Sequence, residues 1–106
     1  MRSLDIESVR FDETGLVPLI CQDQSSRQVL MLGYANLEAL EKTIESGDVH
    51  FYSRSRAELW HKGATSGNYL RVSEISMDCD SDALLAIVIP VGPACHTGAT
   101  SCFEEG

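Results

Sequence analysis

The pattern of apolar and polar positions opens with two runs of β-favouring residues, at positions 16–22 and 28–34. The five residues between them, DQSSR, are polar and of the kinds that form tight turns. Two such runs joined by a short polar segment are typical of a β-hairpin. The start of the chain is therefore predicted to form two antiparallel strands.

A different period follows directly after the second run. Apolar residues recur there with the spacing of one helical face, three and then four residues apart. These residues are Leu37, Leu40 and Ile44. Asn36 precedes them as a helix N-cap, and Gly47 follows them as a C-terminal stop signal. The pattern predicts one short amphipathic helix over residues 37–46.

The rest of the chain favours β-structure again. Three stretches are rich in β-favouring residues: 49–54, 70–78 and 83–91. The alternation changes phase within the second of them, and a β-bulge near Ser73 and Glu74 would reconcile its two halves. Residues 56–69 contain the sequence GATSGN, which is predicted to be a loop, as is the tail GPACHTGATSCF. We therefore expect an α+β fold, mostly antiparallel β with one clear short helix.

Length and composition place these elements in one small domain. With 106 residues the chain suits a single domain, residues 1–106. Its formal net charge of -8 repels phosphate backbones, so we expect no nucleic-acid partner. The N-terminus shows no apolar leader, and the longest apolar run, 83–91, is too short to span a bilayer. The sequence thus indicates a cytoplasmic protein with no membrane partner, in which four cysteines are metal ligands or free thiols rather than disulfides.

Three of the cysteines are candidate metal ligands. Cys79 lies in a predicted turn, and Cys95 and Cys102 lie in the tail with six residues between them. The CxxC spacing of structural zinc sites is absent, and three thiolates without an obvious fourth ligand suit a catalytic zinc that keeps one position for water. Three half-buried thiols without a metal remain the alternative. Cys21 lies in an apolar strand and is interpreted as a packing residue.

Three carboxylates surround Cys79 in the sequence DCDSD: Asp78, Asp80 and Asp82. Carboxylates crowded this closely repel one another unless a cation joins them, and hard oxygen ligands suit Mg²⁺ or Ca²⁺. The segment does not continue as an EF-hand loop, because Ala83 and Ile89 occupy the glycine and glutamate positions of that loop. A magnesium site and a solvated acidic turn remain the two interpretations.

Histidine supplies the candidate for proton transfer. His96 directly follows Cys95, and the neighbour of a metal ligand usually points away from the metal. An imidazole with an unperturbed pKa of about 6.5 can exchange protons at neutral pH. His50 and His61 are weaker candidates, and a structural role is favoured for His50.

Basic residues cluster just ahead of a loop of small residues. Arg54, Arg56 and Lys62 precede the segment TSGN. That segment consists of Thr65, Ser66, Gly67 and Asn68. Small residues let backbone N–H groups approach an anion, and hydroxyls and cations add contacts, so the pattern suggests a phosphate cradle. It lacks the P-loop motif, and an ordinary surface loop is the alternative. Trp60 is either a core residue or a stacking surface for a ring.

Together these segments resemble a known family. FYSRSRAELWHKGATSGN, DCDSDALL and GPACHTGATSCF occur in the order and with the gaps of phosphoribosyl-AMP cyclohydrolase, of histidine biosynthesis. The resemblance extends over residues 16–103. The chain ends just after SCF, so it resembles the stand-alone form rather than the form fused to a pyrophosphohydrolase domain. Ala64 stands where the family usually has Glu, so any proton transfer or water ordering by that Glu must be done otherwise here.

The resemblance implies a subunit arrangement and a set of cofactors. It implies an intertwined homodimer with one zinc per subunit at the interface, bound by Cys79 of one subunit and by Cys95 and Cys102 of the other. It also implies Mg²⁺ at the three aspartates. Mg²⁺ and the basic cluster would hold the two phosphates of a phosphorylated nucleotide substrate.

The implied reaction opens the adenine ring of 1-(5-phosphoribosyl)-AMP at its N1–C6 bond. Alkylation at N1 makes C6 more electrophilic, and zinc lowers the pKa of a bound water towards about 7 so that it can attack C6. N1 needs a proton as it leaves, and His96 is the candidate donor. The product keeps a carboxamide on the imidazole and carries a formimino group on N1.

Three other functions compete with this one. A zinc nucleobase deaminase also attacks such rings, but its HxE and PCxxC elements are absent from the sequence. A structural-zinc binding module needs a fourth ligand and has no position for water. A thiol redox protein needs a CxxC beside a βαβ pattern, which the sequence lacks.

Overall fold

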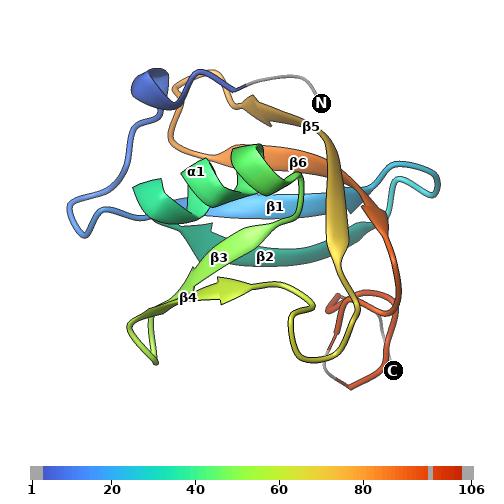
Figure 1. The fold of residues 1–106 in the computed structure, drawn as a ribbon. Helices are drawn as coiled ribbons and strands as arrows, with labels where there is room; N and C mark the ends of the chain where they lie inside the picture. The colour runs from blue at the N-terminus through green and yellow to red at the C-terminus, as the bar shows by residue number, and fades with distance from the viewer. Residues whose placement is uncertain (1–3, 96, 104–106) are drawn as a thin grey trace.

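The computed structural model describes residues 4–95 and 97–103 (Figure 1). Over this part of the chain it contains one α-helix, six β-strands and one short 3-10 helix. In chain order they are η1 (Ile6–Ser8), β1 (Val17–Asp23), β2 (Val29–Ala35), α1 (Leu37–Ser46), β3 (His50–Ser53), β4 (Glu58–His61), β5 (Leu70–Met77) and β6 (Leu84–Pro90).

Four of the strands form a mixed sheet in the order β2-β1-β6-β5. β1 pairs antiparallel with β2, and β5 pairs antiparallel with β6. The central pair, β1 and β6, is parallel and joins the first strand of the chain to the last. β3 and β4 form a separate antiparallel ribbon. The single described helix and the mostly antiparallel pairing confirm the predicted α+β class, and the predicted hairpin is confirmed as β1–β2.

The helix α1 has the bounds that the sequence predicted. Its first turn is capped by Asn36, whose side-chain oxygen accepts a hydrogen bond from the N–H of Ala39 at 2.9 Å. Gly47 ends it with a positive φ of 81° and donates its N–H to the carbonyl of Thr43 at 2.9 Å. Leu40 is fully buried on the face that packs inward. None of the described residues belongs to a helix with the length and apolar character needed to cross a bilayer.

The later strands agree with the sequence pattern except in one segment. β3, β5 and β6 lie within the three predicted stretches, and a register shift between Val72 and Glu74 confirms the bulge in β5. Within residues 56–69 the predicted GATSGN loop is confirmed, but β4 precedes it and was not predicted. Four residues, ELWH, offer too few alternations to separate a strand from a loop by pattern. β4 forms a strand by pairing with β3. Across this pair the centre of the Phe51 ring lies 5.4 Å from the centre of the Trp60 ring.

The core lies on one face of the sheet. α1 and the β3–β4 ribbon cover that face, as Figure 1 shows. Its side chains alternate along the two central strands and are at most 1% exposed: Val17, Leu19, Cys21, Leu84, Ala86 and Val88. The other face of the sheet, which we call the outer face, has no described helix or strand packed on it.

Two loops lie at opposite ends of β6 (Figure 1). Residues 78–83 connect β5 to the start of β6, and we call them the acidic turn. Residues 92–95 and 97–103 follow the end of β6, and we call them the cysteine loop. The fold therefore separates Cys79 from the other two predicted zinc ligands.

Candidate active site

The cysteine loop folds back on itself and brings two thiols together. The N–H of Cys95 donates to the carbonyl of Ala99 at 3.1 Å, which closes the loop. The N–H of Cys102 donates to the carbonyl of Leu30 at 2.7 Å, and the buried Ser101 hydroxyl donates to the same strand at 2.6 Å, so the loop is fixed to β2. As a result the thiols of Cys95 and Cys102 lie close enough for each to shift the pKa of the other.

Neighbouring groups set the ionisation of the two thiols in opposite directions. The Thr97 hydroxyl donates to the Cys95 sulfur at 3.1 Å, and this bond is the largest of the effects that lower the pKa of Cys95. Burial, followed by the contact with Cys95, raises the pKa of Cys102. The positive charge of Lys62 acts to lower the pKa of both thiols. A thiolate that contacts a second thiol near a cation is suited to bind a soft metal ion.

Cys79 lies far from this pair. It is exposed in the acidic turn, whereas Cys95 and Cys102 follow the other end of β6. The seven residues of β6, at about 3.3 Å each, separate the two ends by roughly 20 Å. Because zinc–thiolate bonds are only about 2.3 Å long, one chain cannot place all three cysteines on one ion. The structure thus brings together two of the three predicted zinc ligands within a single chain.

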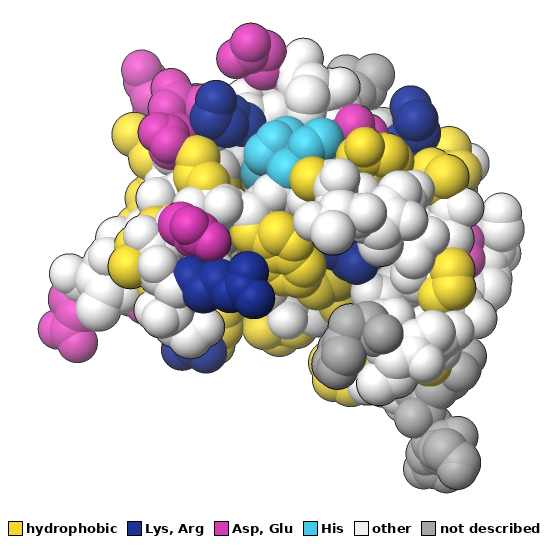
Figure 2. Space-filling model, turned by 60° about the horizontal axis from the view of Figure 1, so that its bottom comes forward, with side chains coloured by type: hydrophobic (Ala, Val, Ile, Leu, Met, Phe, Trp, Pro, Cys, Tyr) yellow, Lys and Arg dark blue, Asp and Glu magenta, His cyan; other side chains and the backbone are white. Residues whose placement is uncertain are grey.

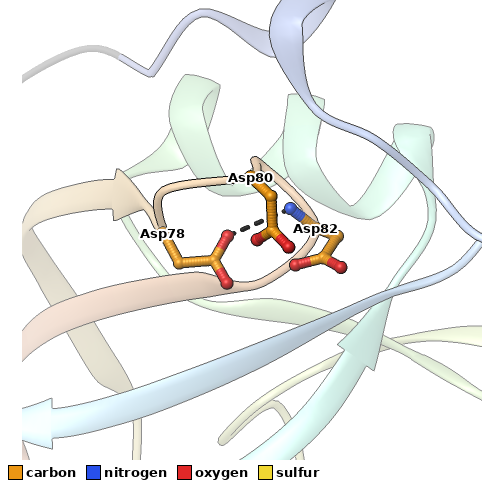
Figure 3. Close-up of side chains that lie close together, drawn as sticks. All are labelled: Asp78, Asp80 and Asp82. Carbon is orange, nitrogen blue, oxygen red and sulfur yellow. Dashed lines mark hydrogen bonds between the residues drawn. The ribbon is translucent and has the colours of Figure 1, made fainter.

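The three predicted magnesium ligands converge, as Figure 3 shows. Asp78, Asp80 and Asp82 each offer a carboxylate oxygen, and these oxygens lie within 4.8 Å of one another. A tight turn brings them together. Ser81 takes a positive φ of 65°, and the Asp78 carboxylate accepts hydrogen bonds from the N–H groups of Asp82 at 3.1 Å and Ala83 at 3.2 Å. Within residues 4–95 and 97–103 this is the one group of three potential metal-binding side chains.

The close carboxylates of the acidic turn affect the ionisation of one another. A side-chain hydrogen bond between them is the main cause that lowers the pKa of Asp80 and raises the pKa of Asp82. A hard cation that joins the oxygens would relieve the repulsion between the carboxylates. The donor set of the turn therefore fits Mg²⁺.

Five of the predicted substrate-binding residues line one cavity beside Cys95. They are Trp60, Lys62, Thr65, Ser66 and Asn68. The cavity has a volume of about 260 Å³. Lys62 is only 6% exposed, and its Nζ lies 5.7 Å from the centre of the Trp60 ring. Figure 2 shows Lys and Arg side chains beside a hydrophobic surface at the centre of this side of the molecule. A cation, hydroxyls and an aromatic ring in one cavity suit a phosphorylated heterocycle.

The remaining predicted substrate residues lie apart from this cavity. Arg56 lines a second cavity of about 320 Å³, which shares Trp60 with the first. Arg54 places its guanidinium 4.1 Å from the centre of the Tyr34 ring instead. Gly67 shapes the loop through a positive φ of 79° and a hydrogen bond from its N–H to the carbonyl of Gly63 at 2.7 Å. Among the predicted basic residues, Lys62 is therefore the one placed beside Cys95.

The structure describes two of the three candidate histidines. His96 lies outside the described residues, so its role stays a prediction. His50 and His61 face each other on β3 and β4 with ring centres 4.2 Å apart and an angle of 11° between the rings. The carbonyl of Asp48 lies 2.9 Å from His50 Nδ1, and its carboxylate lies 3.6 Å from His61 Nε2. Burial is the main cause that lowers the pKa of His50. These contacts support the structural role predicted for His50.

Several residues that shape the site were missed from the sequence. Three that line the cavity beside Cys95 lie within the quoted motifs but were not singled out: Gly63, Pro93 and Gly98. Position 92 requires a glycine, because a Cβ there would overlap the side chain of Asn68. Arg10 lines a cavity of about 450 Å³ beside the aspartates, and nothing in its sequence context indicated that position. The first three would have been found by considering every small residue within the motifs.

The motifs and the geometry can now be compared with known proteins. A family model described as phosphoribosyl-AMP cyclohydrolase matches residues 31–104. The chain belongs to the phosphoribosyl-AMP cyclohydrolase family. The match includes the cavity, the acidic turn and the cysteine loop, and it confirms the family predicted from three sequence motifs.

Curated relatives of this phosphoribosyl-AMP cyclohydrolase domain are named histidine biosynthesis bifunctional protein HisIE. The protein of Oceanobacillus iheyensis is 57% identical over 104 residues, which are 98% of this chain and 48% of the relative. The protein of Bacillus subtilis is 58% identical over 99 residues, 93% of this chain and 47% of the relative. The protein of Staphylococcus aureus is 62% identical over 90 residues, which are 85% of this chain and 43% of the relative. The chain spans about half the length of these relatives.

Proposed function

We propose that the chain is a zinc-dependent hydrolase that opens the adenine ring of 1-(5-phosphoribosyl)-AMP at the N1–C6 bond. The observation that carries this proposal is the cavity in which Trp60 and Lys62 meet Cys95. It places groups suited to a phosphorylated heterocycle next to a thiol pair suited to zinc. Family membership supports the same substrate. The product is the formimino-carboxamide ribotide intermediate of histidine biosynthesis.

Two chains share each zinc in this proposal. Cys95 and Cys102 contact each other and supply half of a tetrahedral thiolate site. Since Cys79 of the same chain is at the other end of β6, the Cys79 ligand comes from a second copy. We therefore propose an intertwined homodimer with one zinc per subunit. When bound, zinc lowers the pKa of a water molecule, so that hydroxide is available to attack the ring at neutral pH.

The side chains of the cavity bind and orient the nucleotide. The Trp60 ring, which is 43% exposed, offers a face on which the adenine can stack. The Lys62 ammonium and the hydroxyls of Thr65 and Ser66 can hold one phosphate. The second phosphate is proposed to bind through Mg²⁺ held by the three aspartates.

A proton must reach N1 as the N1–C6 bond breaks. We propose His96 as the donor because it follows Cys95 in the sequence and because an imidazole exchanges protons near neutral pH. Ala64 offers a methyl group at the position where the family usually has Glu, so this position supplies no carboxylate for the same step.

The cytoplasm is the proposed compartment. All four cysteines are unpaired, as expected for thiols kept reduced. A phosphorylated nucleotide and a second copy of the chain are the proposed partners.

The function is tested by incubating the purified chain with phosphoribosyl-AMP and following the ultraviolet change as the ring opens. Cys102→Ser removes a thiolate, so we expect it to lose zinc and at least about 10²-fold in turnover. Cys21→Ser is the matched control. Cys21 is fully buried and burial raises its pKa to about 12, so this variant should keep its zinc.

Two results would contradict the proposal. A folded, zinc-loaded wild-type protein that leaves phosphoribosyl-AMP intact rejects the reaction. Full zinc content in Cys102→Ser, or none in folded Cys21→Ser, rejects the ligand assignment.

A further inference from the structure

The N-terminal segment lies beside the acidic turn and forms a cavity with it. The N–H of Arg10 donates to the carbonyl of Ser81 at 2.8 Å, which fixes the segment to the turn, and Figure 1 shows the two side by side. The cavity between them has a volume of about 450 Å³, and its lining includes Asp80 and Asp82. It shares no lining residue with the cavity beside Cys95, so it is a second hollow, next to the proposed magnesium site.

Arg10 is, among the described residues, the one cation that lines this cavity. Within the described part of the chain its guanidinium forms no ion pair with a carboxylate. The side chain of Asp82 is the main cause that lowers the pKa of Asp80, and the charge of Arg10 adds to it from beyond ion-pair distance. The guanidinium is thus near the carboxylates without being bound to them, which leaves its donors available for a ligand.

The balance of charge explains why a cation is needed at this place. This step rests on the function proposed above, in which Mg²⁺ held by the three aspartates binds the second phosphate. Three carboxylates outweigh the charge of one Mg²⁺, so the metal-loaded turn alone keeps a net negative charge that repels a phosphate. Arg10 supplies the missing positive charge, and its planar guanidinium can donate two parallel hydrogen bonds to a phosphate.

The other walls of the cavity suit a ribose. Phe11, Leu16 and Pro18 add apolar surface against which a sugar ring can pack. Asp12 also lines the cavity, but its Oδ1 already accepts hydrogen bonds from the N–H of Thr14 at 2.8 Å, from the Thr14 hydroxyl at 2.6 Å and from the N–H of Leu16 at 3.0 Å. These bonds offset the negative charge of Asp12 and hold the segment in place. A volume of about 450 Å³ is within the range of small-molecule sites.

We propose that Arg10 binds the second phosphate of the substrate together with Mg²⁺, and that the cavity which it lines takes the ribose attached to that phosphate. Arg10 donates to one phosphate oxygen while Mg²⁺ coordinates another, so both can hold the same group. The ligand class of this cavity is a sugar phosphate. The family match begins at residue 31, so the motifs that identify the family do not include Arg10.

The test compares Arg10→Met with Arg27→Met, which removes an equally exposed cation beyond the far end of β1. With zinc and Mg²⁺ present, KM for phosphoribosyl-AMP should rise by about 10- to 10²-fold in Arg10→Met, because a charge-assisted bond to the phosphate is lost. The value of kcat should change by less than about threefold, because the reacting bond is not touched. Arg10→Lys keeps the charge without the planar fork and should recover part of the loss. Arg27→Met should behave as the wild type.

Mg²⁺ binding separates a phosphate contact from a structural role. A guanidinium near the aspartates repels Mg²⁺, so calorimetric titration without nucleotide should show that Arg10→Met binds Mg²⁺ at least as tightly as the wild type. A residue that only shaped the turn would weaken Mg²⁺ binding when it is replaced. Weaker Mg²⁺ binding in folded Arg10→Met, or a KM equal to that of Arg27→Met, would overturn the proposal. Should Arg10→Met fail to fold, Arg10→Gln decides by the same two measurements.

Ribose 5-phosphate separates this inference from the proposed function. In a Lys62→Met background, which lacks the cation of the other phosphate position, ribose 5-phosphate should bind in the presence of Mg²⁺. Adding Arg10→Met should weaken this binding by about tenfold or more. That result would support Arg10 even if the wild type left phosphoribosyl-AMP intact, which would reject the function alone. Equal affinity with and without Arg10, or no binding at all, would reject the inference, and ring opening by the wild type would still support the function.

Discussion

At the scale of single residues, the burial and charge of Lys62 are the most informative features of the site. Lysines are seldom buried without a partner, because the ammonium loses its hydration. Lys62 is 6% exposed, and its charge acts on the thiols of Cys95 and Cys102. The sequence placed it in a phosphate cradle, and the structure places it in the cavity beside Cys95.

Replacing Lys62 with Met keeps the length of the side chain and removes its charge. We expect kcat/KM for phosphoribosyl-AMP to fall by about 10²-fold, because a charge-assisted bond to a phosphate of roughly 2–3 kcal/mol is lost. Lys42→Met is the matched control, since Lys42 is exposed on α1. Equal activities of the two variants in the ultraviolet assay would show that Lys62 does not hold the substrate.

A second residue prediction concerns the contact between Gly92 and Asn68. A methyl group at position 92 would overlap the Asn68 side chain, which lines the cavity, so Gly92→Ala should displace that side chain while the sheet stays folded. We expect about a tenfold rise in KM, equal to about 1.4 kcal/mol of binding. The mutation should add little in an Asn68→Ala background, because the displaced group is already absent. Additive effects in this double-mutant cycle would mean that Gly92 acts on something other than Asn68.

At the scale of elements, the sequence predicted the structures that local signals define, but it did not predict pairings between distant segments. The helix was predicted to the residue because Asn36 and Gly47 mark its ends by local hydrogen bonds. β4 was missed because its four residues become a strand only through pairing with β3. The parallel pairing of β1 with β6 has no local signal at all. For the same reason the sequence placed the cysteines in a turn and in the tail, but the attachment of the tail to β2 became visible only in the fold.

The β3–β4 ribbon should make the fold sensitive to acid through His50. Burial is the first cause that lowers its pKa below the ordinary 6.5, and the charge of His61 adds to this. The unfolded chain therefore binds more protons than the folded chain once the pH falls below 6.5, so stability is complete above that pH and declines beneath it. Thermal unfolding followed by circular dichroism should show a smaller loss of Tm between pH 7.5 and 5.5 in His50→Gln than in the wild type. Identical losses of Tm in the variant and the wild type would assign the acid sensitivity to other groups. Measurements of Tm from pH 7.5 to 9 serve as the control.

At the scale of the whole molecule, the separation of the cysteines predicts complementation between two inactive variants. Cys79→Ser lacks the ligand from the acidic turn, and Cys102→Ser lacks one from the cysteine loop. In a mixed dimer one site carries both defects and the other carries neither. Random pairing makes about half of the dimers mixed, so roughly a quarter of full activity should return after the two are unfolded and refolded together. Wild-type chains refolded in parallel set the reference, and a mixture that stays inactive beside an active reference would place each site within a single chain.

The parallel pairing of β1 with β6 also has a consequence for how the protein is made. β6 is the last strand of the chain, yet it lies between β1 and β5 in the sheet. A ribosome adds about 5–20 residues per second, and β6 is translated roughly sixty residues after β1, so the first hairpin waits several seconds for its neighbour. During that interval one edge of β1 offers unpaired backbone groups to any other nascent chain nearby. The sheet closes only as translation of this segment ends, so the fold of the first hairpin is completed by the last strand to be made.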